Sequence, residues 1–243
     1  MKLSIVTIAF NSENEIEETL KSCISIKDKF PSTEYIIIDG KSTDRTLDII
    51  SKYQINIDKI LSESDDGIYD AFNKGMDLSI GEYIIFMNSG DTFHDQFDIS
   101  NFFSNINIED EVIYCNTLIK FGNGKLMLKK FGNKNLNFIV GLPFCHQSVF
   151  VKKNIYKKHQ FQTKYKIFST VDYFYNLFIN KVKFKYYDYL VSNYDYTGVS
   201  SNFNYNSVKE LTKIHKNNQN INIYIYMILY YTLLKSYIKK VIN

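Results

Sequence analysis

Residues 3–11 read LSIVTIAFN, a short apolar run that ends in a polar side chain. Three further apolar runs end in the same way, at 35–39 (YIIID), 57–65 (IDKILSESD) and 83–91 (YIIFMNSGD). Apolar residues at helical spacing fill the stretches between these runs, at 13–26, 43–53 and 67–79. Buried strands that alternate with helices predict right-handed crossovers and a parallel sheet covered on both faces.

The pattern changes after Asp91. Two apolar runs joined by Gly-Asn-Gly at 122–124 predict a hairpin with strands at 112–121 and 125–131. Further strands are expected at 148–151 and 184–194, and helices at 171–179, 207–216 and 221–242. We therefore expect an α/β protein with a parallel half at 1–91, a mixed half at 92–205 and a helical tail at 206–243.

The three cysteines, Cys23, Cys115 and Cys145, are odd in number, far apart and without CxxC spacing. This pattern argues against a disulfide framework and a cysteine-ligated zinc site, and it is typical of a reducing compartment. The apolar run at the amino terminus is too short for a signal peptide, so it predicts a first buried strand. We expect a cytoplasmic protein whose 243 residues build one large α/β domain with a helical appendage.

Charge is distributed unevenly along the chain. Residues 1–111 carry 22 acids and 9 basic residues, a balance of −13, whereas residues 112–243 carry 4 acids and 20 lysines, a balance of +16. The basic half is either a solvated face or a surface that attracts an anionic partner. A nucleic acid is not favoured, because the usual motifs are missing and the chain has one arginine, Arg45, in its acidic half.

Polar side chains follow all four predicted strands of the parallel half: Asn11, Asp39, residues 63–66 and residues 88–91. Ligands of such sheets bind at the carboxyl ends of the strands. Carboxylates gathered there can hold a divalent cation and accept hydrogen bonds from a uracil or a ribose. They repel a phosphate, and a metal ion between carboxylate and diphosphate removes that conflict.

Four segments, taken in order, resemble the signatures of the family 2 glycosyltransferases, which have the GT-A fold. They are SIVTIAFN at 4–11, IDGKSTDRT at 38–46, SESDDGIYDAFNKG at 62–75 and GEYIIFMNSGD at 81–91. FCHQS at 144–148 and GVSS at 198–201 match more loosely. The resemblance implies a Rossmann-like nucleotide-binding half, followed by a mixed acceptor-binding half.

The resemblance also implies roles for individual residues. It places the nucleotide-sugar site at Thr7, Asn11, Asp39, Asp65, Asn73, Lys74, Asn88 and Ser89. Asp39 would accept a hydrogen bond from uracil, and Lys74 would reach a phosphate or remain solvated. Asp91 would bind the metal, Mn²⁺ or Mg²⁺, as the last acid of an Asp-x-Asp motif. Because Asn88 and Gly90 stand where acids are common, metal independence stays open.

The expected catalytic base lies in the segment STVDYF at 169–174, where Asp172 matches the family position. It is also the one acid among 14 lysines between Lys120 and Lys185. A single base and a direct displacement would invert the anomeric centre. His146 is expected on the acceptor or phosphate side of the site, with a structural role as the alternative.

The apolar stretch at 221–234, followed by lysines, predicts a helix that packs on the domain, in a homodimer interface, or in a membrane interface. The sequence thus predicts an inverting, UDP-sugar-dependent glycosyltransferase of bacterial O-antigen or capsule synthesis, acting at the inner membrane face on a lipid-diphosphate-linked or saccharide acceptor. Two other classes stay open. A nucleotidyltransferase would need a Gly- and Arg-rich phosphate loop, where the chain has AFNS at 9–12. In a non-catalytic sugar-nucleotide or membrane-surface binding protein, Asp172 would be dispensable.

Overall fold

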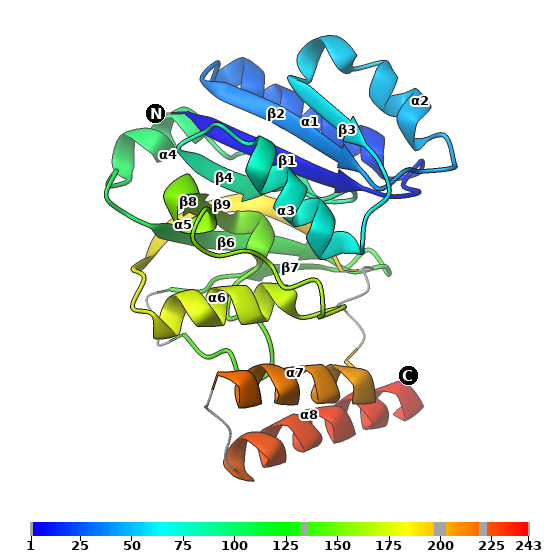
Figure 1. Cartoon of the computed structure of the whole chain (residues 1–243), viewed down its shortest axis with the longest axis vertical. Coiled ribbons are helices and arrows are strands. Elements are labelled where there is room, and N and C mark those ends of the chain that lie inside the picture. Colours follow the sequence, from blue (N-terminus) through cyan, green and yellow to red (C-terminus); the bar gives the residue numbers. More distant parts are fainter. Residues whose placement is uncertain (1, 133–135, 197–202, 219–222, 243) are drawn as a thin grey trace.

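The computed structural model describes residues 2–132, 136–196, 203–218 and 223–242. Within these ranges one nine-stranded mixed sheet runs through both halves of the chain, with helices on both of its faces (Figure 1). Seven strands and one two-residue strand follow each other along the sheet in the order β3-β2-β1-β4-β8-β6-β9-β5, and β7 pairs with β6 off this path.

The four strands predicted in the first ninety residues form the parallel part of the sheet, as expected. They are β1 (Leu3–Ala9), β2 (Thr33–Asp39), β3 (Lys59–Ser62) and β4 (Tyr83–Phe86). All residues of β1, β2 and β4 are buried, because helices cover both faces there. The edge strand β3 alternates between half-buried and exposed residues. Four carboxyl ends therefore share one rim.

The mixed part of the sheet begins beside β4. It contains β5 (Thr92–Phe93), β6 (Val112–Lys120), β7 (Leu126–Lys129), β8 (Val149–Lys152) and β9 (Phe184–Asp195). β8 pairs antiparallel with both β4 and β6, and β9 runs parallel to β6. The predicted hairpin is present as β6 and β7. Because β9 lies next to β6 and β5, its carboxyl end reaches the same region as the turn after β4.

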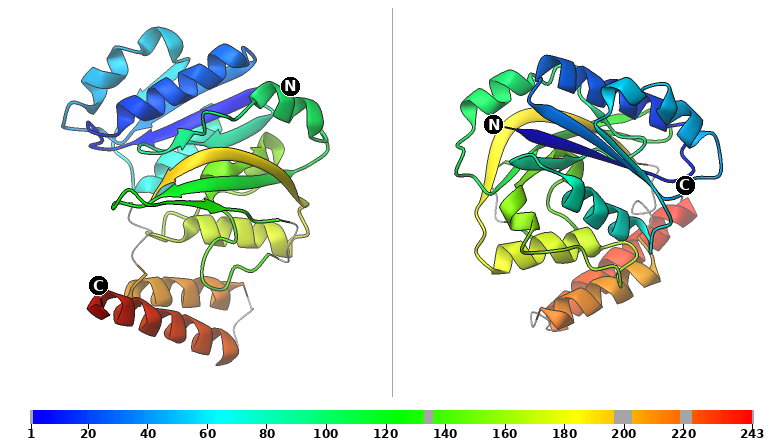
Figure 2. Two further views of the ribbon diagram at one scale, coloured as in Figure 1. Left: turned by 180° about the vertical axis from the view of Figure 1, so that it is seen from behind. Right: turned by 45° about the horizontal axis from the view of Figure 1, so that its top comes forward.

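The helices form two layers (Figure 2). On one face lie α1 (Ile16–Lys29), α2 (Thr46–Ser51) and α4 (Ile99–Asn105), packed against Leu3, Ile5 and Ala9 of β1. On the other face lie α3 (Ile68–Leu78), α5 (Lys153–Tyr156) and α6 (Ser169–Ile179), packed against Val6 and Ile8. The last helices, α7 (Tyr205–Asn217) and α8 (Ile223–Ile242), lie beyond α6 (Figure 1). Inside the described ranges, no helix has both the length and the hydropathy needed to cross a membrane.

Three local expectations were wrong. The helix expected at 43–53 is shorter: α2 ends at Ser51, and a 3₁₀ turn at Gln54–Asn56 follows. The helix expected from residue 13 begins at Ile16, because Asn11 has a left-handed backbone (φ 48°) and residues 13–15 form a turn. Helix α4 was not expected, although Asp98 is a recognisable N-cap that accepts a hydrogen bond from the Asn101 N–H at 2.9 Å.

Glu34 is a buried carboxylate that ties β2 to the start of β4. Its Oε1 accepts hydrogen bonds from the Ser4 hydroxyl and the Ile80 and Gly81 N–H groups, and Lys59 lies 3.4 Å from Oε2. Burial opposes ionisation, but these donors and the Lys59 charge outweigh it and lower the pKa of Glu34 below its ordinary 4.5.

Glu34→Gln is expected to lower the free energy of unfolding by about 1–3 kcal/mol at neutral pH, since it leaves a buried donor facing other donors. Because the folded-state pKa is lowered, the difference from the native protein should shrink as the pH falls below 4.5. Urea unfolding at several pH values measures this, with Glu18→Gln on the exposed side of α1 as the control. An effect equal at pH 7 and at pH 4 would contradict the argument.

Candidate functional site

Asp39 stands at the rim as predicted, but its carboxylate is fully buried. It pairs with Ala9 of β1 and Ser62 of β3 at the ends of the three strands. Its Oδ2 accepts hydrogen bonds from the Ser42 N–H at 3.0 Å and the Ser62 hydroxyl at 2.7 Å, and its Oδ1 accepts one from the Ser42 hydroxyl. Asp39 thus organises the loop after β2, at the position where a uracil contact was predicted.

Asn11 joins the loops after β1 and β2. Its Oδ1 accepts a hydrogen bond from the Thr43 N–H at 2.9 Å, and its own N–H donates to the Ser42 hydroxyl at 2.9 Å. Asparagine tolerates the left-handed backbone at this position better than most residues do. The two loops therefore form one rigid wall of the rim.

Phe10 and Asp65 meet above this wall at Gly40. A Cβ at Gly40 would lie 2.8 Å from Asp65 Oδ2 and 3.2 Å from the Phe10 ring, so no larger residue fits there without displacement. The Phe10 side chain is 62% exposed, although it is large and apolar. An exposed aromatic face beside buried carboxylates suits a planar ligand such as a nucleobase. Phe10 was not among the predicted site residues; its signal in the sequence is an aromatic residue directly after a buried strand.

Lys74 on α3 is surrounded by acids. Its Nζ lies 2.7 Å from Asp65, 2.9 Å from Glu63 and 3.1 Å from Asp70, and it donates to the Ser64 carbonyl at 3.0 Å. Burial disfavours the ammonium, but its hydrogen bonds to the three carboxylates outweigh this and raise the pKa of Lys74. The lysine stays charged and its charge is outnumbered locally, so a direct phosphate contact would need these pairs to rearrange.

Asn73 acts as a clamp between α3 and the segment before α6. Its Nδ2 donates to the Phe161 carbonyl and its Oδ1 accepts from the Phe161 N–H, both at 2.9 Å. The amide therefore supports the wall of the site from behind. The predicted nucleotide-sugar role of Asn73 remains untested.

Several polar groups of the rim lie together in the turn after β4, at residues 88–91. Gly90 has a positive φ of 93°, and its N–H donates to the Thr19 hydroxyl of α1 at 3.1 Å. The same hydroxyl donates to the Asp91 carbonyl at 2.8 Å. The turn closes through the Asp91 N–H and the Asn88 carbonyl at 2.9 Å. One threonine thus fixes the backbone that carries the predicted metal-binding motif.

Asp91 is buried and meets two segments distant in sequence. Its Oδ2 accepts a hydrogen bond from Gln147 Nε2 at 2.9 Å, and its Oδ1 accepts one from the Asp195 N–H at 3.1 Å. Burial raises the pKa of Asp91 to about 7 despite these donors, and the charge of Asp195 adds to the increase. The carboxylate is thus held in place without a cationic partner among the described residues.

His146 lies on the other side of this turn. Asn88 Nδ2 donates to His146 Nε2 at 3.3 Å, and burial lowers the pKa of His146 to about 4, so the ring is neutral. Within the described part of the chain, Asn88 Oδ1 and the Ser89 hydroxyl are buried and have no hydrogen-bond partner. Buried polar atoms are nearly always paired in folded proteins. Of the unpaired buried atoms among the described residues, these two lie in the turn after β4, at the strand rim.

The oxygens at this turn fit a divalent cation in part. Asp91 and Asn88 Oδ1 are hard ligands of the kind that Mn²⁺ and Mg²⁺ take, and the amide oxygen is unpaired. No group of three His, Cys, Asp or Glu side chains that could hold a metal occurs among the described residues. A cation here would therefore need a diphosphate and water to complete its shell.

Thr7 is placed inside the sheet and away from the rim. It is fully buried, donates to the Met87 carbonyl at 2.8 Å and shares a hydrogen bond with the Tyr35 hydroxyl at 3.0 Å. Its side chain has no exposed atom for a nucleotide. In this structure Thr7 supports the turn after β4 from below, by holding the carbonyl of the residue before Asn88.

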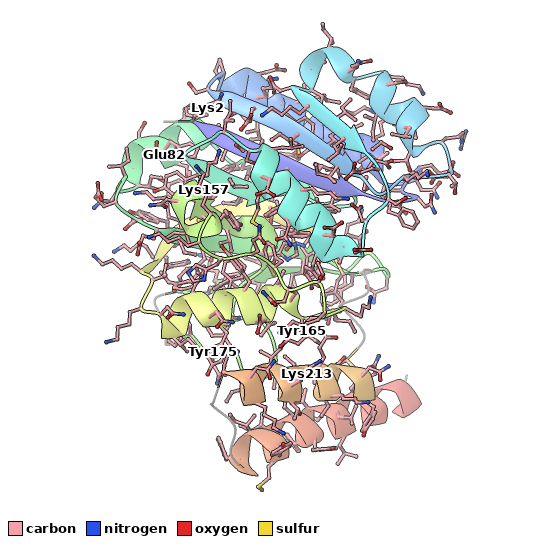
Figure 3. All side chains as sticks on the ribbon, in the orientation of Figure 1. Lys2, Glu82, Lys157, Tyr165, Tyr175 and Lys213 are labelled. Atoms are coloured by element: carbon pink, nitrogen blue, oxygen red, sulfur yellow. The ribbon has the colours of Figure 1, made fainter. Side chains whose placement is uncertain are left out.

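Asp172 is not brought together with the Asp91 group. It is buried in the first turn of α6, and its Oδ1 accepts a hydrogen bond from Asn218 Nδ2 at 3.4 Å at the end of α7. Tyr175, one turn further on, contacts the His215 ring of α7 at 5.5 Å. Figure 3 labels Tyr175 in this region between α6 and α7. Burial raises the pKa of Asp172.

The opposite side of α6 faces the nucleotide half. Tyr173 packs on Phe161 with 4.4 Å between ring centroids, and Phe161 packs on Phe72 of α3, whose ring lies 6.0 Å from His146. These ring contacts thus connect the Tyr173 side of α6 to His146, whereas the Asp172 carboxylate is bonded on the α7 side. The motif expected at 198–201 lies outside the described residues.

A separate cavity of about 800 Å³ lies at the amino ends of β1 and β4, away from the rim. Four lysines and one acid are among its lining residues: Lys2, Lys152, Lys153, Lys157 and Glu82. Figure 3 labels Lys2, Lys157 and Glu82. Ligands of parallel sheets bind at the other end of the strands. This cavity therefore has no part in the candidate site.

Comparison with known proteins agrees with this arrangement. The profile of the family described as Glycosyl transferase family 2 matches residues 4–182. A PGL/p-HBAD biosynthesis glycosyltransferase of Mycobacterium bovis is 24% identical over 181 residues, covering 70% of this chain and 68% of the relative. A poly(ribitol-phosphate) beta-glucosyltransferase of Bacillus spizizenii is 34% identical over 95 residues, covering 37% of this chain and 15% of the relative.

Solved structures show the same fold. Residues 1–349 of S. aureus TarS, also crystallised with UDP, superpose with a TM-score of 0.66 at 18% identity, covering 89% of this chain and 66% of that one. The mannosyltransferase PcManGT of Pyrobaculum calidifontis, in complex with GDP-Man and Mn²⁺, superposes with a TM-score of 0.67 at 11% identity, covering 91% and 65%. The chain spans about two thirds of these crystallised chains, and the predicted GT-A fold is confirmed.

Proposed function

Because the chain belongs to glycosyl transferase family 2, we propose that it moves a sugar, with inversion, from a UDP-sugar to a saccharide or lipid-diphosphate-linked acceptor. The observation that carries the proposal is the unpaired, buried pair of Asn88 Oδ1 and Ser89 Oγ beside Asp91 at the strand rim. These atoms suit a sugar nucleotide, whose hydroxyl and diphosphate groups can complete them.

The donor would lie across the rim, with its base at one end and its diphosphate at the other. The exposed face of Phe10 would stack on the base, beside the loop that Asp39 and Asn11 hold rigid. Asp65, next to Gly40, would contact the ribose or the donor sugar. A UDP donor is supported by the TarS structures with UDP and UDP-GlcNAc.

A cation would be held by Asp91 and Asn88 Oδ1. When bound, Mn²⁺ or Mg²⁺ would neutralise charge on the leaving diphosphate. Asp91 needs to be ionised for this, and Gln147 and the Asp195 N–H orient its two oxygens. His146, neutral and bonded to Asn88, would keep the amide oxygen turned towards the ligand.

In the transfer step an acceptor hydroxyl forms a bond to the anomeric carbon, while the bond from that carbon to the diphosphate breaks. The electron pair leaves with UDP, and a base takes the hydroxyl proton. We assign this base to Asp172, whose raised pKa makes it a stronger base when ionised. In this structure its carboxylate accepts a hydrogen bond from Asn218, so Asp172 would have to leave Asn218 and turn towards the rim to reach a hydroxyl at the anomeric carbon.

The biological setting is proposed from the relatives. Their printed names describe PGL/p-HBAD biosynthesis and glucosyl transfer to poly(ribitol-phosphate). A poly(ribitol-phosphate) acceptor is a phosphate-bearing polymer, and by analogy we propose that this chain helps to build a bacterial surface polysaccharide such as an O-antigen or a capsule. The lysine-rich second half suits a phosphate-bearing acceptor.

The proposal is tested by calorimetry with UDP and GDP, in Mn²⁺ and in EDTA, and by a screen of UDP-sugars for released UDP. We expect UDP to bind more tightly than GDP, and EDTA to weaken that binding. At about 100 times its Kd, UDP should raise the free energy of unfolding by about 2.7 kcal/mol. Binding without any UDP release would favour a non-catalytic binding protein, and release of pyrophosphate from UTP and a sugar 1-phosphate would favour a nucleotidyltransferase.

A further inference from the structure

Helix α8 has apolar residues on both of its long sides. Ile225, Leu229 and Leu233 are buried, and they belong to the same core as Leu211 and Ile214 of α7. A second stripe faces away: Tyr224, Met227, Tyr231 and Leu234 are between 57% and 64% exposed. Their spacing of three, four and three residues places them on one face of the helix. The α8 outer face, as we name these four residues, has no protein partner in the described structure.

Large apolar stripes of this kind usually mark an interaction surface. Single exposed apolar side chains are common, but four in a row on one helix face are not needed for the fold. The carboxyl end of α8 lies on the same side of the molecule as the carboxyl ends of β1 and β4 (Figures 1 and 2). The outer face therefore lies in the outermost layer of the molecule, beyond α6 and α7, and α8 ends on the side of the strand carboxyl ends.

The charges around this face indicate what covers it. Residues 211–243 contain five lysines and no Asp or Glu. Of these lysines, Lys235 lies on the outer face itself, with its Nζ 4.9 Å above the Tyr231 ring. A second copy packed symmetrically through α8 would bring the same lysines, and the one acid of α7 and α8, Glu210, already accepts hydrogen bonds from the backbone of residues 166–168. An anionic surface supplies the missing charge.

We propose that the α8 outer face docks on a lipid bilayer that contains anionic headgroups. Apolar side chains would enter the boundary between headgroups and acyl chains, and tyrosine and lysine would remain at the headgroup level. The purpose of this docking rests on the proposed function. Docking would hold the candidate site beside an acceptor that is anchored in the bilayer by a lipid diphosphate. Lipid binding itself does not depend on donor binding.

The test is sedimentation of the full chain with vesicles of phosphatidylcholine alone and of phosphatidylcholine mixed with phosphatidylglycerol. We expect binding to the mixed vesicles and little to the neutral ones. The double substitution Met227→Gln and Leu234→Gln should weaken binding at least about tenfold, because two apolar side chains no longer enter the lipid. Lys235→Gln should weaken it about fivefold, as expected for one lysine near an anionic surface.

The matched control is Leu126→Gln with Leu128→Gln, two leucines that are also exposed in the basic half, on β7. This variant should bind vesicles as the native chain does. Thermal unfolding of every variant shows whether the protein is folded, and UDP calorimetry separates the two proposals, since either kind of binding can be lost alone. The inference is overturned if the native chain ignores both vesicle types, if the α8 variant binds equally well, or if the native chain is a dimer that the α8 variant converts to a monomer.

Discussion

Asp172→Asn is expected to slow sugar transfer by roughly 10²–10⁴-fold, the range lost when a general base is removed. The amide has nearly the same shape as the carboxylate but cannot take the proton of the acceptor hydroxyl. Burial already disfavours the charge, as the raised pKa of Asp172 indicates, so the variant should be no less stable than the native chain. Initial rates of UDP release, together with UDP calorimetry, measure the two effects separately.

The matched control is Asp188→Asn, which removes another carboxylate of the basic half. Asp188 is 65% exposed at its side chain and lies on β9. It should change the rate little. Full transfer activity in Asp172→Asn would rule out Asp172 as the base. The next candidates would be Asp195 and Glu15, two acids whose Cβ atoms lie close to Gly90 at the rim. If Asp172→Asn lost UDP binding to the same extent as it lost transfer, the residue would instead have a role in folding.

Asp91→Asn is the second change with a large expected effect. It should reduce transfer by roughly 10²–10³-fold, the scale seen when one group that stabilises developing charge is lost. It should also abolish the difference between UDP affinity in Mn²⁺ and in EDTA. The amide can keep the Asp195 N–H bond, and a rotated Gln147 amide can still accept from it.

The stability of Asp91→Asn distinguishes the loss of a metal ligand from a failure to fold. Burial raises the pKa of Asp91 to about 7, which means that the ionised side chain is costly in the folded state. The neutral variant should therefore melt no lower than the native protein at pH 8. The control is Asp98→Asn, which keeps a good N-cap on α4 far from the rim. Unchanged metal dependence of UDP binding in Asp91→Asn would exclude Asp91 as a metal ligand.

Much of the fold could be predicted because its signals are local. Strands β1, β2 and β4 are largely apolar runs, and the Gly-Asn-Gly motif at 122–124 predicts the hairpin of β6 and β7. Strand β5 was missed because two residues are too short for any periodicity. Helix α4 was missed because it has seven residues and buries only Ile99 and Phe102, too few to show a helical period.

The candidate site was predictable only as a set of strand ends. Alternating strands and helices require Asp39 and the turn at Asp91 to share a rim, and both do. The i,i+4 spacing of Asp70 and Lys74 indicates one ion pair. The sequence contains no sign that Glu63 and Asp65 would also reach Lys74, or that Asn73 would bond to a backbone 88 residues away. Those contacts depend on how α3 packs against the loops around it.

The sequence by itself determined the order of apolar strands and helices, hence a parallel sheet with polar residues along one edge. The tertiary structure decided which distant groups meet there. Gln147 and the Asp195 N–H reach Asp91 from 56 and 104 residues away, while Asp172 turns towards α7. The physical reason is that periodicity and turn chemistry act within a few residues, whereas burial of both sheet faces selects partners without regard to their separation along the chain.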